Sequence, residues 1–146
     1  MNIALRYNWT PVENVPDVPY HFPQEVSQHL RDSWRGPAIY RWIVFQQKPG
    51  NLQQFYVGET DLLHRRIYQY LNPRPTQLTN QSLNAGFKKE LEDGRKVILE
   101  ALCFEPFNLE DISISMADLT DKWVRRFLEN LFIVYYSKSG YTVLNE

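Results

Sequence analysis

Two short runs of strand-forming residues separated by a turn constrain the fold more than any other feature of the chain. Residues 38–45 (AIYRWIVF) and 55–58 (FYVG) are rich in β-branched and aromatic side chains, and residues 48–51 (KPGN) between them carry a Pro-Gly pair. Such runs on either side of a turn segment are typical of two paired antiparallel strands. We therefore predict a β-hairpin over this stretch.

Directly after the hairpin, the spacing of apolar residues changes to that of a helix. Leu63, Ile67 and Leu71 recur at intervals of four residues, and Pro73 follows the last of them. This spacing places apolar side chains on one face of a helix, which the proline then ends. Thr60 belongs to the residue types that cap helix N-termini. We expect an amphipathic helix with Thr60 as its N-cap.

The rest of the chain alternates helical and strand patterns. A second helix is predicted over residues 81–93, a strand over 96–104, a loop over 106–115, the longest helix over 116–136 and a short edge segment over 141–144. The order β-β-α-α-β-α indicates an α+β fold. We expect a small central antiparallel sheet of about three strands, flanked by helices.

The first part of the chain, residues 1–37, differs from the remainder. Pro11, Pro16, Pro19 and Pro23 punctuate its first part, so an extended and irregular path is expected there. Val26 and Leu30 stand four apart after the last of these prolines and predict one short helix. We interpret residues 1–37 as an amino-terminal arm packed on a domain formed by residues 38–146.

The composition fits one compact domain of 146 residues and excludes several classes of protein. The net charge of -1 lacks the excess of basic residues usual in nucleic-acid binders, so such a role needs a local basic cluster. One cysteine, Cys103, allows no internal disulfide and no cysteine-based zinc site, and its apolar neighbours predict a buried thiol. Because no run approaches the roughly 18 apolar residues of a membrane span, and no signal-peptide core is visible, we expect a cytoplasmic protein.

Glu129 lies within the strongly apolar residues 127–136 (FLENLFIVYY) of the longest predicted helix. A carboxylate in such a helix is costly to bury unless it is paired or bound to a metal. Two interpretations stay open. Glu129 forms an ion pair with Arg125 or Arg126, one turn earlier, or it serves a functional site.

Arg66 follows His64 and Arg65 in a basic cluster on the first predicted helix, four residues before Tyr70. Residues at this spacing share a helix face. A guanidinium beside a phenol suits a phosphodiester, because the guanidinium binds phosphate oxygens and the phenol exchanges hydrogen bonds with them. The alternative is a solvated helix face.

In combination, these residues resemble the GIY-YIG nuclease family. Residues 38–40 (AIY) and 56–58 (YVG) correspond to the two strand motifs of that family, Arg66 to its helical arginine and Glu129 to its late glutamate. The family includes homing endonucleases, some restriction enzymes and the nuclease domain of the excinuclease C subunit. The resemblance covers roughly residues 37–145.

The resemblance implies a metal-dependent endonuclease that hydrolyses phosphodiester bonds in DNA. It assigns catalytic roles to Tyr40, Tyr56, Arg66, Tyr70, Glu129 and Asn145. Glu129 is then the ligand of one Mg²⁺ or Mn²⁺, hard cations that prefer oxygen. Arg66 binds a non-bridging phosphate oxygen, and Tyr40 orients or deprotonates the attacking water, assisted by Tyr56. Taken alone, strand tyrosines such as these two are more often packing residues.

The chain departs from the family pattern at three places, one of which is a hairpin loop longer than in the most compact relatives. Ala38 replaces the first glycine of the first motif but keeps a small residue there. Relatives carry an asparagine directly after the tyrosine that matches Tyr141, where this chain has Thr142. Asn145, three residues further on, is the candidate for that role.

The partner expected from the resemblance is DNA, of a strandedness that the sequence leaves open, with a homodimer as a further possibility. Trp42 and Tyr68 are candidates for stacking on bases. The candidate basic surface consists of Arg65, Arg74, Lys88, Lys89, Arg95 and Lys96. The alternative function is a catalytically inactive nucleic-acid-binding or protein-interaction module on the same fold.

Overall fold

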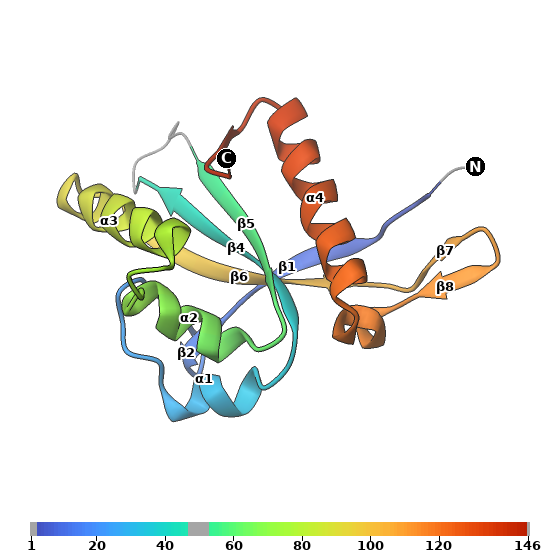
Figure 1. Cartoon of the computed structure of the whole chain (residues 1–146), viewed down its shortest axis with the longest axis horizontal. Coiled ribbons are helices and arrows are strands. Elements are labelled where there is room, and N and C mark those ends of the chain that lie inside the picture. Colours follow the sequence, from blue (N-terminus) through green and yellow to red (C-terminus); the bar gives the residue numbers. More distant parts are fainter. Residues whose placement is uncertain (1–2, 47–52, 146) are drawn as a thin grey trace.

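A computed structural model describes residues 3–46 and 53–145, and the turn predicted at 48–51 lies outside these residues. The helices are α1 (Gln28–Ser33), α2 (Leu63–Leu71), α3 (Leu78–Glu92), a 3-10 turn (Met116–Thr120) and α4 (Lys122–Lys138). The strands are β1 (Tyr7–Pro11), β2 (Glu13–Val15), β3 (Val18–Pro19), β4 (Ala38–Phe45), β5 (Gln54–Thr60), β6 (Lys96–Phe104), β7 (Phe107–Leu109), β8 (Ile112–Ile114) and β9 (Thr142–Val143). Figure 1 shows their arrangement.

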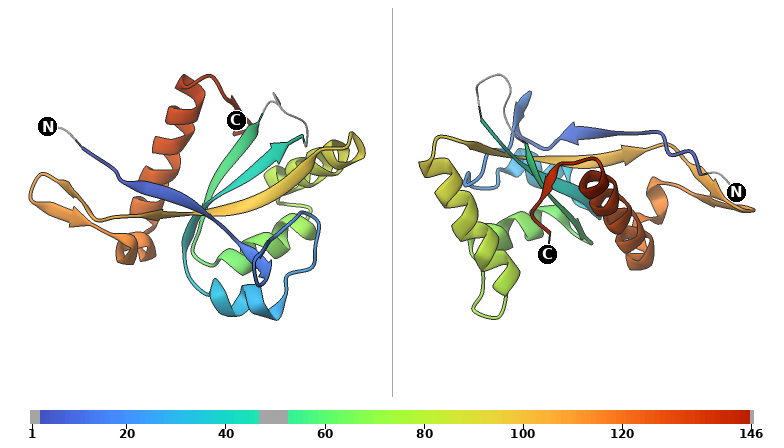
Figure 2. Two further views of the ribbon diagram at one scale, coloured as in Figure 1. Left: turned by 180° about the vertical axis from the view of Figure 1, so that it is seen from behind. Right: turned by 90° about the horizontal axis from the view of Figure 1, so that it is seen from above.

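The fold is α+β, as predicted, but its main sheet has five strands, not about three. The strand order is β1-β6-β4-β5-β9, with antiparallel pairs except between β5 and β9, which run parallel. The predicted hairpin forms the centre, with Tyr40 opposite Gly58. The two additional strands come from the ends of the chain. β1, from the amino-terminal arm, lies along β6 (Figure 2), and β9 follows α4.

Two hydrophobic cores lie on opposite faces of the central strands. Side chains alternate along a strand, so Tyr40 and Trp42 enter one core, whereas Ile39 and Ile43 enter the other. The first core is closed by α1, α2, α3 and aromatic residues of the arm, and the second by α4. Figures 1 and 2 show β4 and β5 between these two groups of helices.

Several predicted boundaries are wrong. The second helix begins at Leu78 rather than at residue 81, and the predicted loop at 106–115 contains the hairpin of β7 and β8. The predicted helix over 116–136 is divided at Asp121, whose side chain accepts a hydrogen bond from the Trp123 backbone and so begins α4 as its N-cap. Cys103 is half-buried rather than buried, and its sulfur lies 3.4 Å from the Thr10 hydroxyl oxygen.

Thr60 does not cap α2. The N-cap is Leu62, without a side-chain hydrogen bond, and the Thr60 hydroxyl accepts one from the Leu62 N–H at 3.2 Å. Thr60 thus fixes the turn from β5 into α2, the helix that bears Arg66. None of the helices in the described ranges has the length and apolar character of a membrane span.

Candidate active site at the edge of β5

The predicted site residues gather around the free edge of β5. Beyond β9, which pairs only with Gln54 and Phe55, no strand in the described part of the chain covers this edge. Asn145 takes the place of one. Its side chain accepts a hydrogen bond from the Val57 N–H at 2.9 Å and donates one to the Val57 carbonyl at 2.6 Å.

Glu129 reaches the same edge from α4. The backbone of Glu59, two residues beyond Val57 and therefore on the same side of the strand, is close enough to the Glu129 carboxyl to lower its pKa. Asn145 and Glu129 thus both lie along the edge of β5. The helix that covers one face of the sheet thereby brings its carboxylate around to the face that carries the tyrosines.

Three phenols form a chain on that face. The Tyr40 and Tyr70 hydroxyl oxygens lie 2.6 Å apart, and the Tyr56 ring packs edge-on against the Tyr70 ring with their centroids 6.4 Å apart. Burial raises the pKa of each of the three phenols. For Tyr40, the nearby positive charge of Arg66 is the largest effect in the opposite direction. In the protein without a bound ligand or metal, these three phenols are therefore neutral hydrogen-bonding groups at neutral pH.

Exposure distinguishes the phenols from one another. Tyr40 and Tyr70 are each only 2% exposed, whereas Tyr56 is half-buried and lines an open groove. A water or phosphate oxygen in that groove can contact Tyr56 first. Tyr40, which the resemblance gives the leading role, is not among the residues that line the groove.

The Tyr40 ring fits against the backbone of Gly58, its partner across the hairpin. A Cβ at position 58 would lie 2.4 Å from both Cζ and the hydroxyl oxygen of Tyr40. Contacts this short cannot be accommodated without moving one of the two groups. The absence of a side chain at Gly58 therefore makes room for the Tyr40 ring, which explains the glycine of the YVG segment in structural terms.

Arg66 lies among these groups without a partner of its own. It affects the pKa of Tyr40, Tyr56 and Glu129, so its charge acts on all three. No hydrogen bond or ion pair to the Arg66 guanidinium is found within residues 3–46 and 53–145, and its Nε is buried and unsatisfied. A buried, unpaired guanidinium nitrogen is costly and favours binding of an anion.

Glu129 is not paired with either arginine that the sequence offered. Arg125 binds Glu59 instead, with its Nε 2.6 Å from a Glu59 carboxylate oxygen, and Arg126 only lowers the pKa of Glu129 at a distance. The pKa of Glu129 is nevertheless raised overall, because burial and the negative charge of Glu59 outweigh the effect of Arg126. A second carboxylate beside Glu129, with its own arginine, was not expected from the sequence, although Glu59 directly follows the YVG segment.

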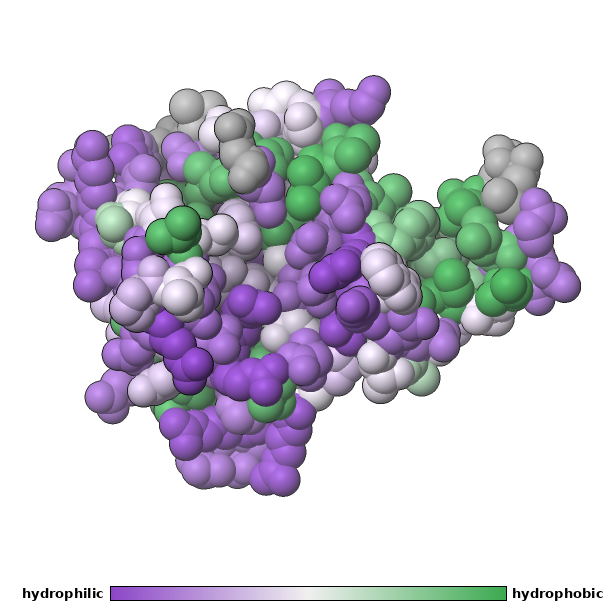
Figure 3. Space-filling view, viewed as in Figure 1, coloured by the Kyte–Doolittle hydropathy of each residue, from purple (hydrophilic) through white to green (hydrophobic). Residues whose placement is uncertain are grey.

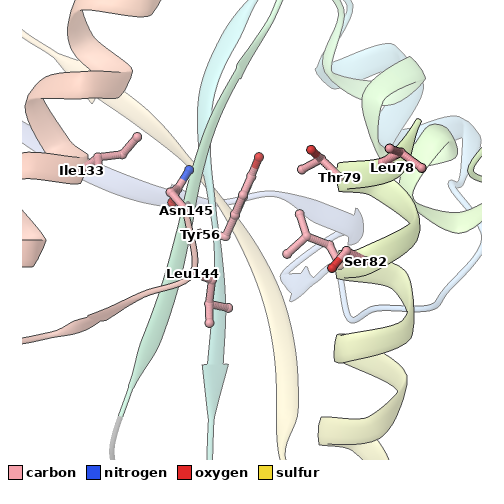
Figure 4. Close-up of a pocket in the computed structure, with 8 residues that line it drawn as sticks. Tyr56, Leu78, Thr79, Ser82, Ile133, Leu144 and Asn145 are labelled. Carbon is pink, nitrogen blue, oxygen red and sulfur yellow. The ribbon is translucent and has the colours of Figure 1, made fainter. Parts of the chain in front are cut away.

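The groove beside these residues has a volume of about 600 Å³. Figure 4 shows Tyr56 and Asn145 in its middle, Ile133 of α4 on one side and the first turns of α3 on the other. Leu78, Thr79 and Ser82 supply that second wall. The lining combines apolar side chains with the hydroxyl groups of Tyr56, Thr79 and Ser82 and with the amide of Asn145.

The candidate residues for nucleic-acid contact differ in their accessibility and in their partners. Trp42 is fully buried in the core and is not accessible to a base, whereas Tyr68 is 56% exposed. Arg65 pairs with Asp61, and Arg95 with Glu90 and Asp93. The charges of these two arginines are therefore partly neutralised within the protein.

A cluster of three or more carboxylate, histidine or cysteine side chains able to hold a metal is absent from the described residues. Glu129 is a single carboxylate at the site, since Glu59 is engaged by Arg125. This donor set fits Mg²⁺, which usually keeps several waters and takes one or two protein carboxylates together with substrate phosphate. It does not fit a cation that requires a complete cage of protein ligands.

No family model, no curated protein and no solved structure that was compared with this chain matches it. The likeness to GIY-YIG nucleases accordingly remains an interpretation of the residues and their placement.

Proposed function

We propose that the protein is a metal-dependent endonuclease of the GIY-YIG type that hydrolyses phosphodiester bonds in DNA. The observation that carries this proposal is the unpaired Arg66 guanidinium, placed close to a half-buried carboxylate and a chain of phenols. An arginine in this position has an unsatisfied donor and a positive charge with no matching anion. A phosphate group supplies both an acceptor and a compensating charge.

Glu129 would hold the Mg²⁺ or Mn²⁺ ion. When bound, the cation supplies positive charge to the scissile phosphate and its leaving oxygen. The raised pKa of Glu129 is consistent with this role, because a carboxylate that is buried beside another negative group gains from a cation nearby.

The protein's own groups divide the remaining tasks. Arg66 binds a non-bridging oxygen of the phosphate and stabilises the charge that develops as water attacks phosphorus and the bond to the leaving oxygen breaks. Tyr56, the phenol that borders the groove, orients the water. Tyr70, which is hydrogen-bonded to Tyr40, packs edge-on against the Tyr56 ring and positions it. Asn145 keeps the edge of β5 and Tyr56 in place.

The proposal is tested with Mg²⁺-dependent cleavage assays on single-stranded, duplex and branched DNA, with EDTA as the metal-free control. We expect Arg66→Ala and Glu129→Gln each to reduce the cleavage rate by on the order of a hundredfold or more. Arg65→Ala is the matched control, because Arg65 is its neighbour on α2 but is exposed and paired with Asp61. Arg66→Ala cleaving as fast as Arg65→Ala, or no cleavage of any substrate by the unmodified protein, would contradict the proposal.

A further inference from the structure

The outer face of α4 is apolar and open to solvent. Trp123, Phe127 and Leu131 follow one another at four-residue intervals, and Val134 and Tyr135 continue the same stripe. Their exposed fractions are 64%, 43%, 39%, 50% and 51%. Surface helices normally turn such a stripe toward a core. The exposed residues are called here the outer stripe of α4. They form a second apolar face of the helix, separate from the buried face that packs on the sheet.

The first described residues of the chain extend this apolar surface. Ile3, Leu5 and Tyr7 border a groove of about 380 Å³ whose other wall is the outer stripe of α4. Figure 3 shows hydrophobic residues gathered over α4 and the adjoining amino-terminal segment. Together, half-exposed side chains of this size offer roughly 600 Å² of apolar area. This area is at the upper end of the range for the largest apolar patch on a monomer. A standard interface takes about 800 Å² from each partner.

We propose that this surface is the interface of a symmetric homodimer in which α4 packs antiparallel on α4 of a second copy. A two-fold axis beside position 129 makes the outer stripe complementary to itself. It sets Trp123 against the partner's Tyr135 and Phe127 against the partner's Leu131. Interfaces related by a two-fold axis must match in this reciprocal way.

The charges at the ends of the helix agree with the antiparallel arrangement. The same axis brings Asp121, the exposed N-cap residue, opposite the partner's Lys138, in the last turn of the helix. The reciprocal pair forms at the other end. A parallel two-fold pairing would instead place Asp121 beside Asp121 and Lys138 beside Lys138, so this pair of residues favours the antiparallel orientation.

The dimer leaves the candidate active site open. With about 100° of rotation per residue, Glu129 projects from α4 on the side opposite the centre of the outer stripe. Each subunit would therefore keep its own groove free, with the two sites facing away from the interface. The inference does not depend on the proposed nuclease function.

The test is the mass of the full-length protein in solution by analytical ultracentrifugation, over a range of concentrations. We expect a reversible dimer and, for Leu131→Glu, a dissociation constant at least about tenfold higher. Leu78→Glu is the matched control, since Leu78 is 72% exposed on α3, away from the stripe, and should leave the dimer unchanged. Circular dichroism confirms that the variants are folded.

A charge exchange tests the orientation independently. Asp121→Lys and Lys138→Asp should each weaken the dimer, and the double variant should restore it. A monomeric unmodified protein overturns the inference, as does a dimer that Leu131→Glu and Leu78→Glu affect equally. Binding of a different, acidic partner through Lys122 and Arg126, which flank Trp123, would leave the protein monomeric by itself and count against the proposal.

Discussion

At the scale of single residues, the contact between Gly58 and Tyr40 links the fold to the candidate chemistry. Gly58→Ala places a methyl group within 2.4 Å of the Tyr40 ring, which is 2% exposed and cannot move freely. We expect a loss of about 1–3 kcal/mol in the free energy of unfolding and a displaced Tyr40 hydroxyl. Denaturant unfolding measures the first effect and the cleavage assay the second.

Gly86→Ala is the control for this change. Gly86 lies inside α3, where an added methyl group would meet no atom within 4 Å, so alanine should stabilise the protein by roughly 0.5–1 kcal/mol. Equal effects of the two substitutions would show that the Tyr40 contact has no energetic weight.

Glu129 gives a second prediction at this scale, about pH. Because its pKa is raised in the folded protein, the folded state retains a proton that the unfolded chain has already released. The stability contributed by this group therefore decreases as pH rises from the ordinary glutamate range through the raised value. Glu129→Gln, which stays neutral, should unfold at a higher temperature than the unmodified protein above that window.

The difference in melting temperature should shrink as the pH is lowered and Glu129 becomes protonated. Scanning calorimetry at several pH values, without divalent cations, measures it. If the difference in melting temperature does not depend on pH, then ionisation of Glu129 does not destabilise the folded protein.

At the scale of elements, sequence spacing predicted the parts whose evidence is local. The runs at 38–45 and 55–58 and the four-residue spacing of α2 lie within short windows, and the structure has β4, β5 and α2 there. Of the two outer strands, β9 lies within the edge segment predicted at 141–144, whereas β1 was missed because its partner is distant in the chain. β1 pairs with β6, as in Tyr7 with Phe104, and two residues of β9 pair with β5.

The candidate site shows the same division. Residue types and order pointed to the tyrosines, Arg66 and Glu129, but which groups are exposed was not predictable. That Tyr56 rather than Tyr40 borders the groove follows from the packing of α2 and α3 over the sheet. The pairing of Glu59 with Arg125 depends on how α4 is placed against β5, which no local pattern encodes.

Asn145 provides the prediction at this scale. Its side chain occupies the place of a strand beside Val57, so Asn145→Ala leaves one N–H and one carbonyl at the edge of β5 without partners. We expect a cost of about 1–3 kcal/mol in unfolding free energy and faster hydrogen exchange at the Val57 amide. Thr142→Ala, at an exposed position of β9, is the control and should change neither. Unchanged protection of the Val57 amide in Asn145→Ala would contradict this account.

At the scale of the whole molecule, the amino-terminal arm contributes to the larger core. Tyr20 and Leu30 have no exposed surface and Phe22 only 2%, and all three belong to the same hydrophobic cluster as Trp42. Phe22 stacks edge-on against both Trp42 and Phe87, at ring-centroid distances of 6.0 and 5.3 Å. The residues before β4 thus complete the core from which the active-site face is built.

This arrangement predicts the outcome of truncation. Loss of one large buried aromatic side chain typically costs about 3–5 kcal/mol, and a whole domain is stable by only about 5–15 kcal/mol. Residues 38–146 alone should therefore fail to give a cooperative thermal transition, although they contain every candidate catalytic residue. Phe22→Ala in the full chain should lower the unfolding free energy by about 3–5 kcal/mol. Deletion of residues 1–6, which end before β1, is the control and should keep the transition, because the sheet and the first core remain and the second core loses only the half-buried Leu5. A folded 38–146 fragment with near-native stability would mean that the arm only covers a domain able to form without it.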